Sequence, residues 1–594
     1  MTDDYFVTDF QLRKIGTVAE VWVQVDLSFP ENDPRNTPVI TDAHVDQVLD
    51  DYEITIYPII CDYFGVPNFH DGSLAELGAA YVEENGRNVI LISNIRDEFY
   101  YDDKYPYITV GFYWGVFERA FDRNIVTIGC LNYDSYIDMF LATLAHEFQH
   151  LVHDDYLPDD DLFMNEGCSM YAEPLCGYGY SMGDIEAFLA TPDNSLTEWG
   201  DQGGINILAD YGQALLWTVY LSDRFGENFL RDFVTDGIGG INGLNTALAP
   251  FGETFDSVFH DWRLANLLHT DTIGGGVYNY DSIDLNLVDP EWTRIYNVKR
   301  AFFDDKLGTD FGVTTSYLND KTTISKLGSY GTDYIKLSNI RDRFNPQFLF
   351  DGDDYCEFRV WNLVDQDGDG DKEWYSTIAG EEKDILLSAA VDLSLFGANP
   401  TLSFDTYYDI EETWDFGFVQ VSIDGGMTWT SLENAYTTYD FADGGYPAIF
   451  DSLPGLTGSS GGWVNMEFDL TAYAGKSIVL GFRYMTDWAE MNEGWYIDNI
   501  AINGYIIEDG DTTNLFKGPD PEQTDFIVTL IGVNIIGGVE VYTQVTTLEL
   551  NELTEETLGS IFLNDYVTAD EGYVLLVVST TKGLADYSFS VQRG

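Results

Sequence analysis

Hydrophobic residues recur at intervals of three and four between Ser135 and His153. This spacing places them on one side of an α-helix, and neither proline nor glycine interrupts the stretch. Asp134 and Ser135 are residue types that cap the first backbone N–H groups of a helix. The pattern therefore predicts one amphipathic helix with a buried face. Its apolar positions are Ile137, Phe140, Leu141, Leu144, Phe148 and Leu151.

Strand and helix patterns lie on both sides of this helix. Before it, four short runs have the alternating or continuous apolar pattern of strands: residues 19–26, 89–93, 107–112 and 125–128. Residues 41–64 have helical spacing, although 54–60 fit a strand equally well. After the helix, residues 211–233 and 255–268 predict two further helices. The first 300 residues thus predict a mixed α and β region.

The pattern changes from about residue 310 to short alternating strands separated by Gly and Asp turns. Residues 402–406, 418–423 and 478–484 alternate as the strands of a sandwich do, and Asp424-Gly425-Gly426 predicts a hairpin turn. A chain of 594 residues is too long for a single core. The sequence therefore predicts a multidomain protein with a β-rich second half.

Acidic residues far outnumber basic ones, since 101 Asp and Glu against 28 Lys and Arg give a formal net charge of −73. Such a surface repels nucleic acid and anionic membranes. Salt or bound cations reduce its self-repulsion, which leads to the hypothesis of a halophilic or marine source, or of a calcium-rich extracellular setting. No signal peptide is visible at Met1, and the apolar run 526–539 is too short and too rich in glycine to span a membrane.

The predicted helix carries the motif His146-Glu147-Phe148-Gln149-His150. Residues four apart lie on one helical face, so the two imidazoles can bind one metal ion. Glu147 can reach a water at that ion without becoming a ligand, which is the position of a general base. This H-E-x-x-H pattern also occurs by chance in long chains, but only seven histidines are present and three fall within eight positions.

A catalytic zinc ion usually has three protein ligands and one water. A third histidine in the longer pattern H-E-x-x-H-x-x-G-x-x-H is excluded, because His153 replaces the glycine and Tyr156 the last histidine. The segment Asn165-Glu166-Gly167 begins a second predicted helix after an Asp- and Pro-bearing loop, and we take Glu166 as the third ligand. We expect His153 to support the ligands or to lie at the surface.

The motif H-E-F-Q-H followed by N-E-G-x-S-x-Y-A-E resembles the gluzincin zinc metallopeptidases, particularly the hyicolysin-like and immune-inhibitor-A-like secreted enzymes. The resemblance covers about residues 10–300. It implies that His146, His150 and Glu166 bind Zn²⁺ and that Glu147 is the catalytic base. Related enzymes have Asp four residues after the ligand Glu to orient a zinc histidine. This chain has Met170 there, and Glu173 is the candidate to replace it.

The remaining side chains near the motif have less specific roles. Tyr171, Tyr211 and His260 are candidates for stabilising an oxyanion, with ordinary packing as the favoured alternative. The five cysteines do not make a disulfide framework. Cys168 and Cys176 flank the second helix and either pair with each other or remain buried thiols.

The β-rich half carries two further resemblances. The runs V-S-I-D-G-G-M-T-W, F-D-L-T-A-Y-A-G-K and G-W-Y-I-D-N-I resemble the MAM-like jelly-roll module of immune-inhibitor-A peptidases, which implies calcium binding. Gly331–Leu337 and Tyr587–Val591 resemble the first and last strands of one pre-peptidase C-terminal-like sandwich. The expected domains are a zincin-like α+β metallopeptidase (1–305), a β-sandwich part (310–380), the jelly roll (384–504) and a second β-sandwich part (506–594). The two sandwich parts are either halves of one domain or separate domains.

The run from Asp365 to Asp371 alternates acidic residues with glutamine and glycine. Oxygen ligands at Asp365, Asp367 and Asp369, with glycines that allow a tight turn, suit Ca²⁺. An EF-hand loop is excluded because serine occupies position 376, where glutamate is required. A solvated acidic turn without an ion is the alternative.

Taken together, the sequence predicts a secreted or cell-surface zinc endopeptidase that hydrolyses protein or peptide substrates, with Zn²⁺ and Ca²⁺ as cofactors. The rival is a cell-surface adhesion or structural β protein that carries an inactive peptidase domain. A glycosidase with paired carboxylates is a third hypothesis, but no such pair is identifiable.

Overall fold

The computed structural model describes residues 7–593 except for several segments. The exceptions are 32, 78–80, 102, 106–107, 159, 200–206, 287–312, 318–321, 339, 341–345, 355–360, 367–369, 378–382, 427, 443–446, 488–491, 513–514, 517–522 and 551–560. The chain divides into two compact units. The N-terminal unit comprises residues 6–191 and 208–304, and the β unit comprises 1–5, 192–207 and 305–594.

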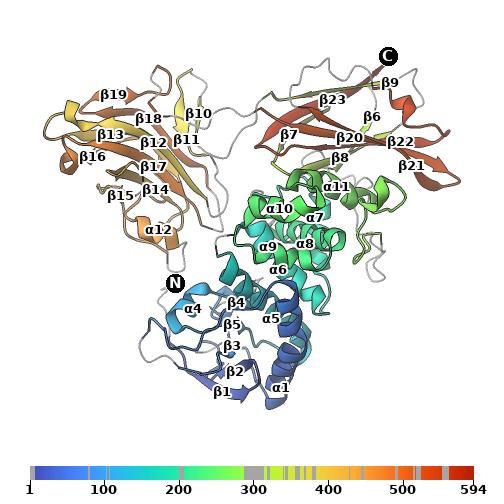
Figure 1. Ribbon diagram of the computed structural model, residues 1–594. Helices are drawn as coiled ribbons and strands as arrows, with labels where there is room; N and C mark the ends of the chain where they lie inside the picture. The colour runs from blue at the N-terminus through green and yellow to red at the C-terminus, as the bar shows by residue number, and fades with distance from the viewer. Residues whose placement is uncertain are drawn as a thin grey trace. The chain divides into compact units, whose positions relative to one another are not determined.

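The N-terminal unit begins with a five-stranded mixed sheet in the order β1-β2-β3-β5-β4 (Figure 1). Its strands are β1 (Phe10–Ile15), β2 (Ala19–Gln24), β3 (Asn88–Ile92), β4 (Gly111–Tyr113) and β5 (Ile125–Ile128). The pairs β2–β3 and β3–β5 are parallel, whereas β4 runs antiparallel to β5. β3 and β5 are almost entirely buried, which matches their continuous runs of Val and Ile. β4 is therefore an edge strand.

Helices form the rest of the N-terminal unit (Figure 1). Before the motif they are α1 (Asp42–Asp51), a π-helical turn (Tyr52–Ile56), α2 (Tyr57–Tyr63), α3 (Glu98–Tyr101) and α4 (Gly115–Phe121). After β5 they are α5 (Tyr133–Tyr156), α6 (Leu162–Leu175), α7 (Met182–Ala190), α8 (Ile207–Phe225), α9 (Asn228–Val234), α10 (Gly240–Leu248) and α11 (Phe255–Leu268). A buried aromatic group holds the later helices together, with Trp262 5.4 Å from Trp217 and 5.7 Å from Phe188 between ring centroids.

Three expected boundaries were wrong. α5 begins at Tyr133 with Asn132 as its N-cap in the left-handed region, and Tyr136 departs from helical geometry, so the caps at Asp134 and Ser135 are incorrect. The helix expected over 211–233 is two helices: α8 ends at Phe225, where Phe225-Gly226 was expected to close it and Gly226 adopts φ 92°, and α9 follows. The strand expected at 107–112 is described only as the short β4. Residues 54–60 are helical, which settles that alternative.

The β unit contains two sandwiches. One packs the sheet β10-β11-β18-β13-β16, with β19 added to β18, against β12-β17-β14-β15. The strands are β10 (Asn362–Val364), β11 (Glu373–Tyr375), β12 (Asp384–Asp392), β13 (Thr401–Asp409), β14 (Phe416–Ser422), β15 (Thr430–Ser431), β16 (Val464–Asp469), β17 (Ser477–Met485), β18 (Gly494–Ile502) and β19 (Tyr505–Glu508), with α12 (Pro447–Ser452) between β15 and β16. Alternate residues of β13 enter the core, as the pattern over 402–406 predicts. The alternation expected over 418–423 and 478–484 is not seen in burial, because β14 is buried throughout and β17 over most of its length.

The other sandwich combines strands that come before the first sandwich in the sequence with strands that come after it. Its sheets are β21-β20-β22-β8-β6 and β7-β23-β9. The strands are β6 (Val313–Tyr317), β7 (Thr322–Leu327), β8 (Thr332–Ser338), β9 (Pro346–Gly352), β20 (Phe526–Ile536), β21 (Val539–Leu550), β22 (Gly572–Ser579) and β23 (Ala585–Arg593). β22 pairs with β8 and β23 with β9. These pairings support one domain interrupted by the first sandwich, and we propose that organisation.

Candidate metal centre

Two neighbouring helices of the N-terminal unit bring the motif residues together. His146 and His150 lie one turn apart on α5, and Glu166 lies in the first half of α6. A short connection between Tyr156 and Leu162 reverses the chain, so the two helices pack side by side. The side chains of His146, His150 and Glu166 converge on one point, with their potential ligand atoms within 4.8 Å of one another.

The three inward-pointing atoms form a nearly regular triangle. His146 Nε2 lies 3.0 Å from His150 Nε2, and Glu166 Oε2 lies 3.4 Å and 3.5 Å from these two nitrogens. Ligands about 2.05 Å from a tetrahedral zinc ion are separated by about 3.3 Å. The triangle therefore has the size of one face of such a coordination sphere.

The outer nitrogens of both imidazoles have partners. His146 Nδ1 lies 3.2 Å from Glu173 Oε1, and His150 Nδ1 lies 2.6 Å from Asn165 Oδ1. Glu173 is two helical turns beyond Glu166 and so lies on the same face of α6. An Nδ1–H that donates to an oxygen fixes the tautomer and presents Nε2 with a lone pair toward a metal ion.

The surroundings of the Glu166 carboxylate fit a bound cation. Its Oε2 is buried and accepts no hydrogen bond of normal geometry. Burial raises the pKa of Glu166, but the adjacent imidazoles of His150 and His146 outweigh burial and lower the pKa. Burial likewise lowers the pKa of His146 and of His150, and Glu166 outweighs it in both. A divalent cation would satisfy all three atoms at once.

Glu147 lies beside the triangle and contacts the edge strand. Its Oε2 accepts a hydrogen bond from the backbone N–H of Tyr113 in β4 at 2.8 Å. The side chain is buried, and burial raises the pKa of Glu147 while the neighbouring histidines oppose the rise. A carboxylate held in place with a raised pKa is better suited to accept a proton than an ordinary surface carboxylate.

Two glycines allow these elements to approach closely. A Cβ on Gly167 would lie 2.7 Å from the carbonyl oxygen of Ala214, so α8 packs directly on α6 behind Glu166. A Cβ on Gly111 would lie 2.6 Å from Thr143 Cγ2, which is on α5 one turn before Glu147. Larger residues at either position would move the helices that carry the site.

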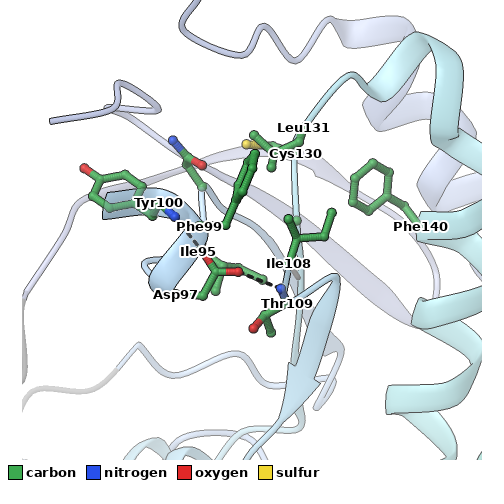
Figure 2. Close-up of a pocket in the computed structure, with 11 residues that line it drawn as sticks. Ile95, Asp97, Phe99, Tyr100, Ile108, Thr109, Cys130, Leu131 and Phe140 are labelled. Atoms are coloured by element: carbon green, nitrogen blue, oxygen red, sulfur yellow. Dashed lines mark hydrogen bonds between the residues drawn. The ribbon is translucent and has the colours of Figure 1, made fainter. Parts of the chain in front are cut away.

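The segment that leads into β4 is anchored by Asp97. Figure 2 shows its carboxylate accepting hydrogen bonds from the N–H groups of Tyr100 and Thr109, at 2.9 Å and 2.6 Å. These residues line a small pocket together with Phe140 of α5. His146, His150 and Glu166 do not line this pocket, so it is not part of the metal centre.

His153 has a structural role away from the triangle. Its side chain is fully buried, with Nε2 2.8 Å from Asp160 Oδ2 and Nδ1 3.2 Å from Gln149 Nε2. Asp160 in turn accepts a hydrogen bond from the N–H of Gly240. The expectation that His153 supports the ligands or lies at the surface was therefore wrong. It ties the end of α5 to the loops that follow.

The three candidates for oxyanion stabilisation differ in what surrounds them. The hydroxyl of Tyr171 donates to Ser222 at 3.2 Å. Burial and then the charge of Arg263 lower the pKa of His260 to about 4, so its imidazole is neutral. Tyr211 lies in the first half of α8. Packing explains Tyr171 without a catalytic role.

Outcomes for the calcium and cysteine predictions differ. Asp367 and Asp369 lie outside the described residues, while Asp365 accepts a hydrogen bond from the N–H of Gly370 at 3.0 Å. Cys168 and Cys176 are free and buried, so the alternative of a disulfide between them is excluded. Burial raises the pKa of the Cys176 thiol to about 12, which keeps it protonated.

Sequence reasoning missed two contacts of the centre. Asn165, the first residue of the N-E-G run, faces His150. Tyr113 contacts Glu147 through its backbone, and a backbone contact leaves no trace in residue types. The position of Asn165 beside a candidate ligand was the only available signal.

Comparison with known proteins identifies part of the β unit. Residues 364–515 match the family model described as Immune inhibitor A-like, MAM domain. The chain therefore contains a MAM domain. It lies in the half of the protein with mostly antiparallel sheets, after the N-terminal unit of helices and mixed sheet.

Curated relatives are similar over short stretches. Pre-pro-metalloprotease PrtV of Vibrio cholerae serotype O1 is 33% identical over 124 residues, which are 20% of this chain and 12% of that protein. Bacillopeptidase F of Bacillus subtilis (strain 168) is 29% identical over 102 residues, or 17% of this chain and 6% of that protein. The chain thus spans a small part of the length of the curated relatives that it matches, and its similarity to a metalloprotease is partial.

Solved structures add no information about the fold. A structure titled as infectious bursal disease virus Gt strain is 11% identical over 41% of this chain and 39% of that chain, with a TM-score of 0.13. The Spr0440 glycoside hydrolase domain, Endo-D, of Streptococcus pneumoniae R6 is 11% identical over 87% and 93%, with a TM-score of 0.15. Scores this low carry no argument for fold or function.

Proposed function

We propose that this protein is a secreted zinc-dependent endopeptidase with a zincin-like catalytic domain. His146, His150 and Glu166 hold the metal ion, and Glu147 is the general base. The observation that carries the proposal is the triangle of two imidazole nitrogens and one buried carboxylate oxygen, with separations of 3.0–3.5 Å. The partial similarity to a metalloprotease supports it.

The residues of the centre define its chemistry. When bound, zinc would polarise the substrate carbonyl and lower the pKa of a coordinated water. Glu147 accepts a proton from the attacking water and returns it to the leaving amine. The N–H of Tyr113 keeps the Glu147 carboxylate in place for both transfers. Glu173 and Asn165 keep the imidazoles aligned.

The edge strand supports an extended peptide as substrate. β4 is the last strand of the described sheet, so one of its sides carries no further strand. An extended peptide can pair with such an edge through backbone hydrogen bonds. The contact between Tyr113 and Glu147 places that edge beside the proposed base. Because such pairing recognises the peptide backbone, it accepts an internal stretch of a chain and does not require one particular side chain.

The acidic surface and the MAM domain support an extracellular or cell-surface location and Ca²⁺ as a second cofactor. Asp365, Asp367 and Asp369 stay the proposed calcium ligands. No described helix is long and apolar enough to cross a membrane. The alternative, an adhesion or structural β protein with an inactive peptidase domain, retains the MAM domain as its favouring observation.

The test is casein hydrolysis and zinc content of the Glu147→Gln variant. We expect hydrolysis to fall by about 10³-fold, because proton transfer is lost, while zinc binding is retained. Glu84→Gln, at an exposed glutamate, is the matched control and should be fully active. A Glu147→Gln variant with wild-type turnover would end this mechanism. A wild-type protein that holds zinc here but hydrolyses no protein would favour the adhesion alternative.

A further inference from the structure

A second cluster of potential metal ligands lies in the N-terminal unit outside the centre just described. It contains His70 from the loop after α2, Glu118 of α4 and Asp155 near the end of α5. One ligand atom of each lies within 4.8 Å of the other two. Figure 1 shows α4 beside β4, at the edge of the sheet.

The imidazole of His70 is held as the imidazoles of metal sites are. Its Nδ1 lies 2.8 Å from Asp122 Oδ1, and its Nε2 points toward Glu118, 3.4 Å from Oε1. A ligating histidine almost always donates its other N–H to a carboxylate, a carbonyl or a water. The cluster therefore repeats the arrangement seen at His146 and His150, where Nδ1 is anchored and Nε2 faces the other ligands.

The carboxylate of Asp155 is anchored as well. It accepts hydrogen bonds from the backbone N–H and the side-chain amide of Asn68, at 2.6 Å and 2.9 Å. Each carboxylate oxygen has two lone pairs, so these bonds leave it able to coordinate an ion. Ligating carboxylates are commonly held by such hydrogen bonds.

The cluster lacks compensating positive charge. The carboxylates of Glu118, Asp122 and Asp155 lie around the His70 imidazole, and Asp154 adds a fourth negative charge near Glu118. Among the residues that the structure describes, none of these carboxylates forms an ion pair with lysine or arginine. Burial and then the charge of Asp155 raise the pKa of Glu118 to about 7. Burial also raises the pKa of Asp155.

We propose that His70, Glu118 and Asp155 bind a second divalent metal ion of the zinc type. An imidazole nitrogen with two carboxylates suits Zn²⁺ and neighbouring transition metals, whereas Ca²⁺ prefers oxygen ligands alone. The ion would lower the repulsion among the four carboxylates and join α4, the end of α5 and the loop at His70. The proposal does not depend on the proposed function.

Tyr113 connects this cluster to Glu147. Its hydroxyl donates to Asp154 at 2.8 Å and lies 3.4 Å from Glu118, while its backbone N–H donates to Glu147. An ion at His70 therefore stiffens the strand residue that positions the proposed base. This consequence, unlike the site itself, rests on the proposed function.

The experiment is the zinc content of the full chain after dialysis against Zn²⁺ held at a low free concentration by a chelating buffer. The chelator keeps weak binding to the acidic surface out of the measurement. We expect two zinc ions in the wild type and one in His70→Gln. Glu118→Gln, a second variant of the same site, should also hold one, and Glu166→Gln should lose the other ion. The double variant His70→Gln/Glu166→Gln should hold none.

His44→Gln is the matched histidine control, because glutamine can also serve at this position of the α1 cap. It should retain two ions. Circular dichroism checks that each variant folds, and either His70→Gln or Glu118→Gln alone decides the question. A wild type with one zinc and a Glu166→Gln variant with none would overturn the proposal. Two ions in a folded His70→Gln variant, or in a folded Glu118→Gln variant, would also overturn it.

Discussion

The two imidazole-bearing clusters of the N-terminal unit offer the same kinds of ligand atom, but the elements that carry these atoms differ in rigidity. At His146, His150 and Glu166 the three atoms are 3.0–3.5 Å apart, and at the second cluster His70 Nε2 lies 3.4 Å from Glu118 Oε1. The first set comes from two packed helices and the second from a loop and two helices. Two packed helices preorganise the first centre, whereas the loop that carries His70 gives the second centre a less rigid support. We therefore expect tighter binding at the first.

The strongest way to break this comparison is to remove Glu166. Glu166→Gln should lose the zinc ion of the first centre and lower casein hydrolysis by about 10³-fold, since metal contributes several kcal/mol to the transition state. The ion at His70 should remain. Zinc analysis and initial rates measure both. Near-normal activity of a Glu166→Gln protein that contains no zinc at the first centre would contradict the mechanism.

Changes to the groups that anchor the imidazoles should have intermediate effects. Glu173→Gln at the first centre and Asp122→Asn at the second remove a carboxylate partner of a histidine. We expect zinc affinity to fall about 10–100-fold at the altered centre only. Competition with a chromophoric chelator measures this fall. Equal losses at both centres in either variant would show that the effect is on folding rather than on alignment.

A third cluster, with carboxylates alone, sharpens the comparison further. Glu411, Asp415 and Asp487 of the MAM domain lie within 4.8 Å of one another, and Asp415 and Asp487 are fully buried. Burial, with the repulsion of Asp487 and Glu411, raises the pKa of Asp415 to about 8. Because the folded state holds this proton more tightly than the unfolded state, stability should fall as pH rises from about 4 to 8.

The Asp415→Asn variant tests that effect in a metal-free buffer. The amide keeps an acceptor for the N–H of Asp487 but does not titrate. We expect the pH-dependent loss of stability, at least ~1 kcal/mol, to disappear from the MAM domain. Hydrogen-exchange protection of β14 at several pH values measures it. An unchanged pH dependence would mean that Asp415 is ionised in the folded protein across this range.

The contrast between clusters also explains what the sequence could predict. The first centre follows from helical spacing, because His146 and His150 are one turn apart and Glu166 and Glu173 two turns apart on a second helix. The replacement of Met170 by Glu173 as a partner could be inferred for that reason. The start of α5 could not, because Asn132, Asp134 and Ser135 are all favoured N-cap types and residue preference alone does not choose among them.

The cluster at His70 had no local signal. Its residues come from three separate segments, and only the packing of α4 against the end of α5 brings them together. The identity of the edge strand could not be predicted either, because β4 precedes β5 in the sequence but lies outside β5 in the sheet. β8 and β22 also pair with each other, although the whole MAM domain lies between them in the sequence. Such contacts arise from tertiary packing, which periodicity along the chain does not encode.

The most direct test of the central claim is anomalous diffraction at the zinc edge from crystals of the zinc-loaded wild-type protein. We predict the strongest peak about 2.1 Å from His146 Nε2, His150 Nε2 and Glu166 Oε2. A weaker peak is expected beside His70. The absence of any peak at the first position, in crystals grown with saturating zinc, would contradict the account.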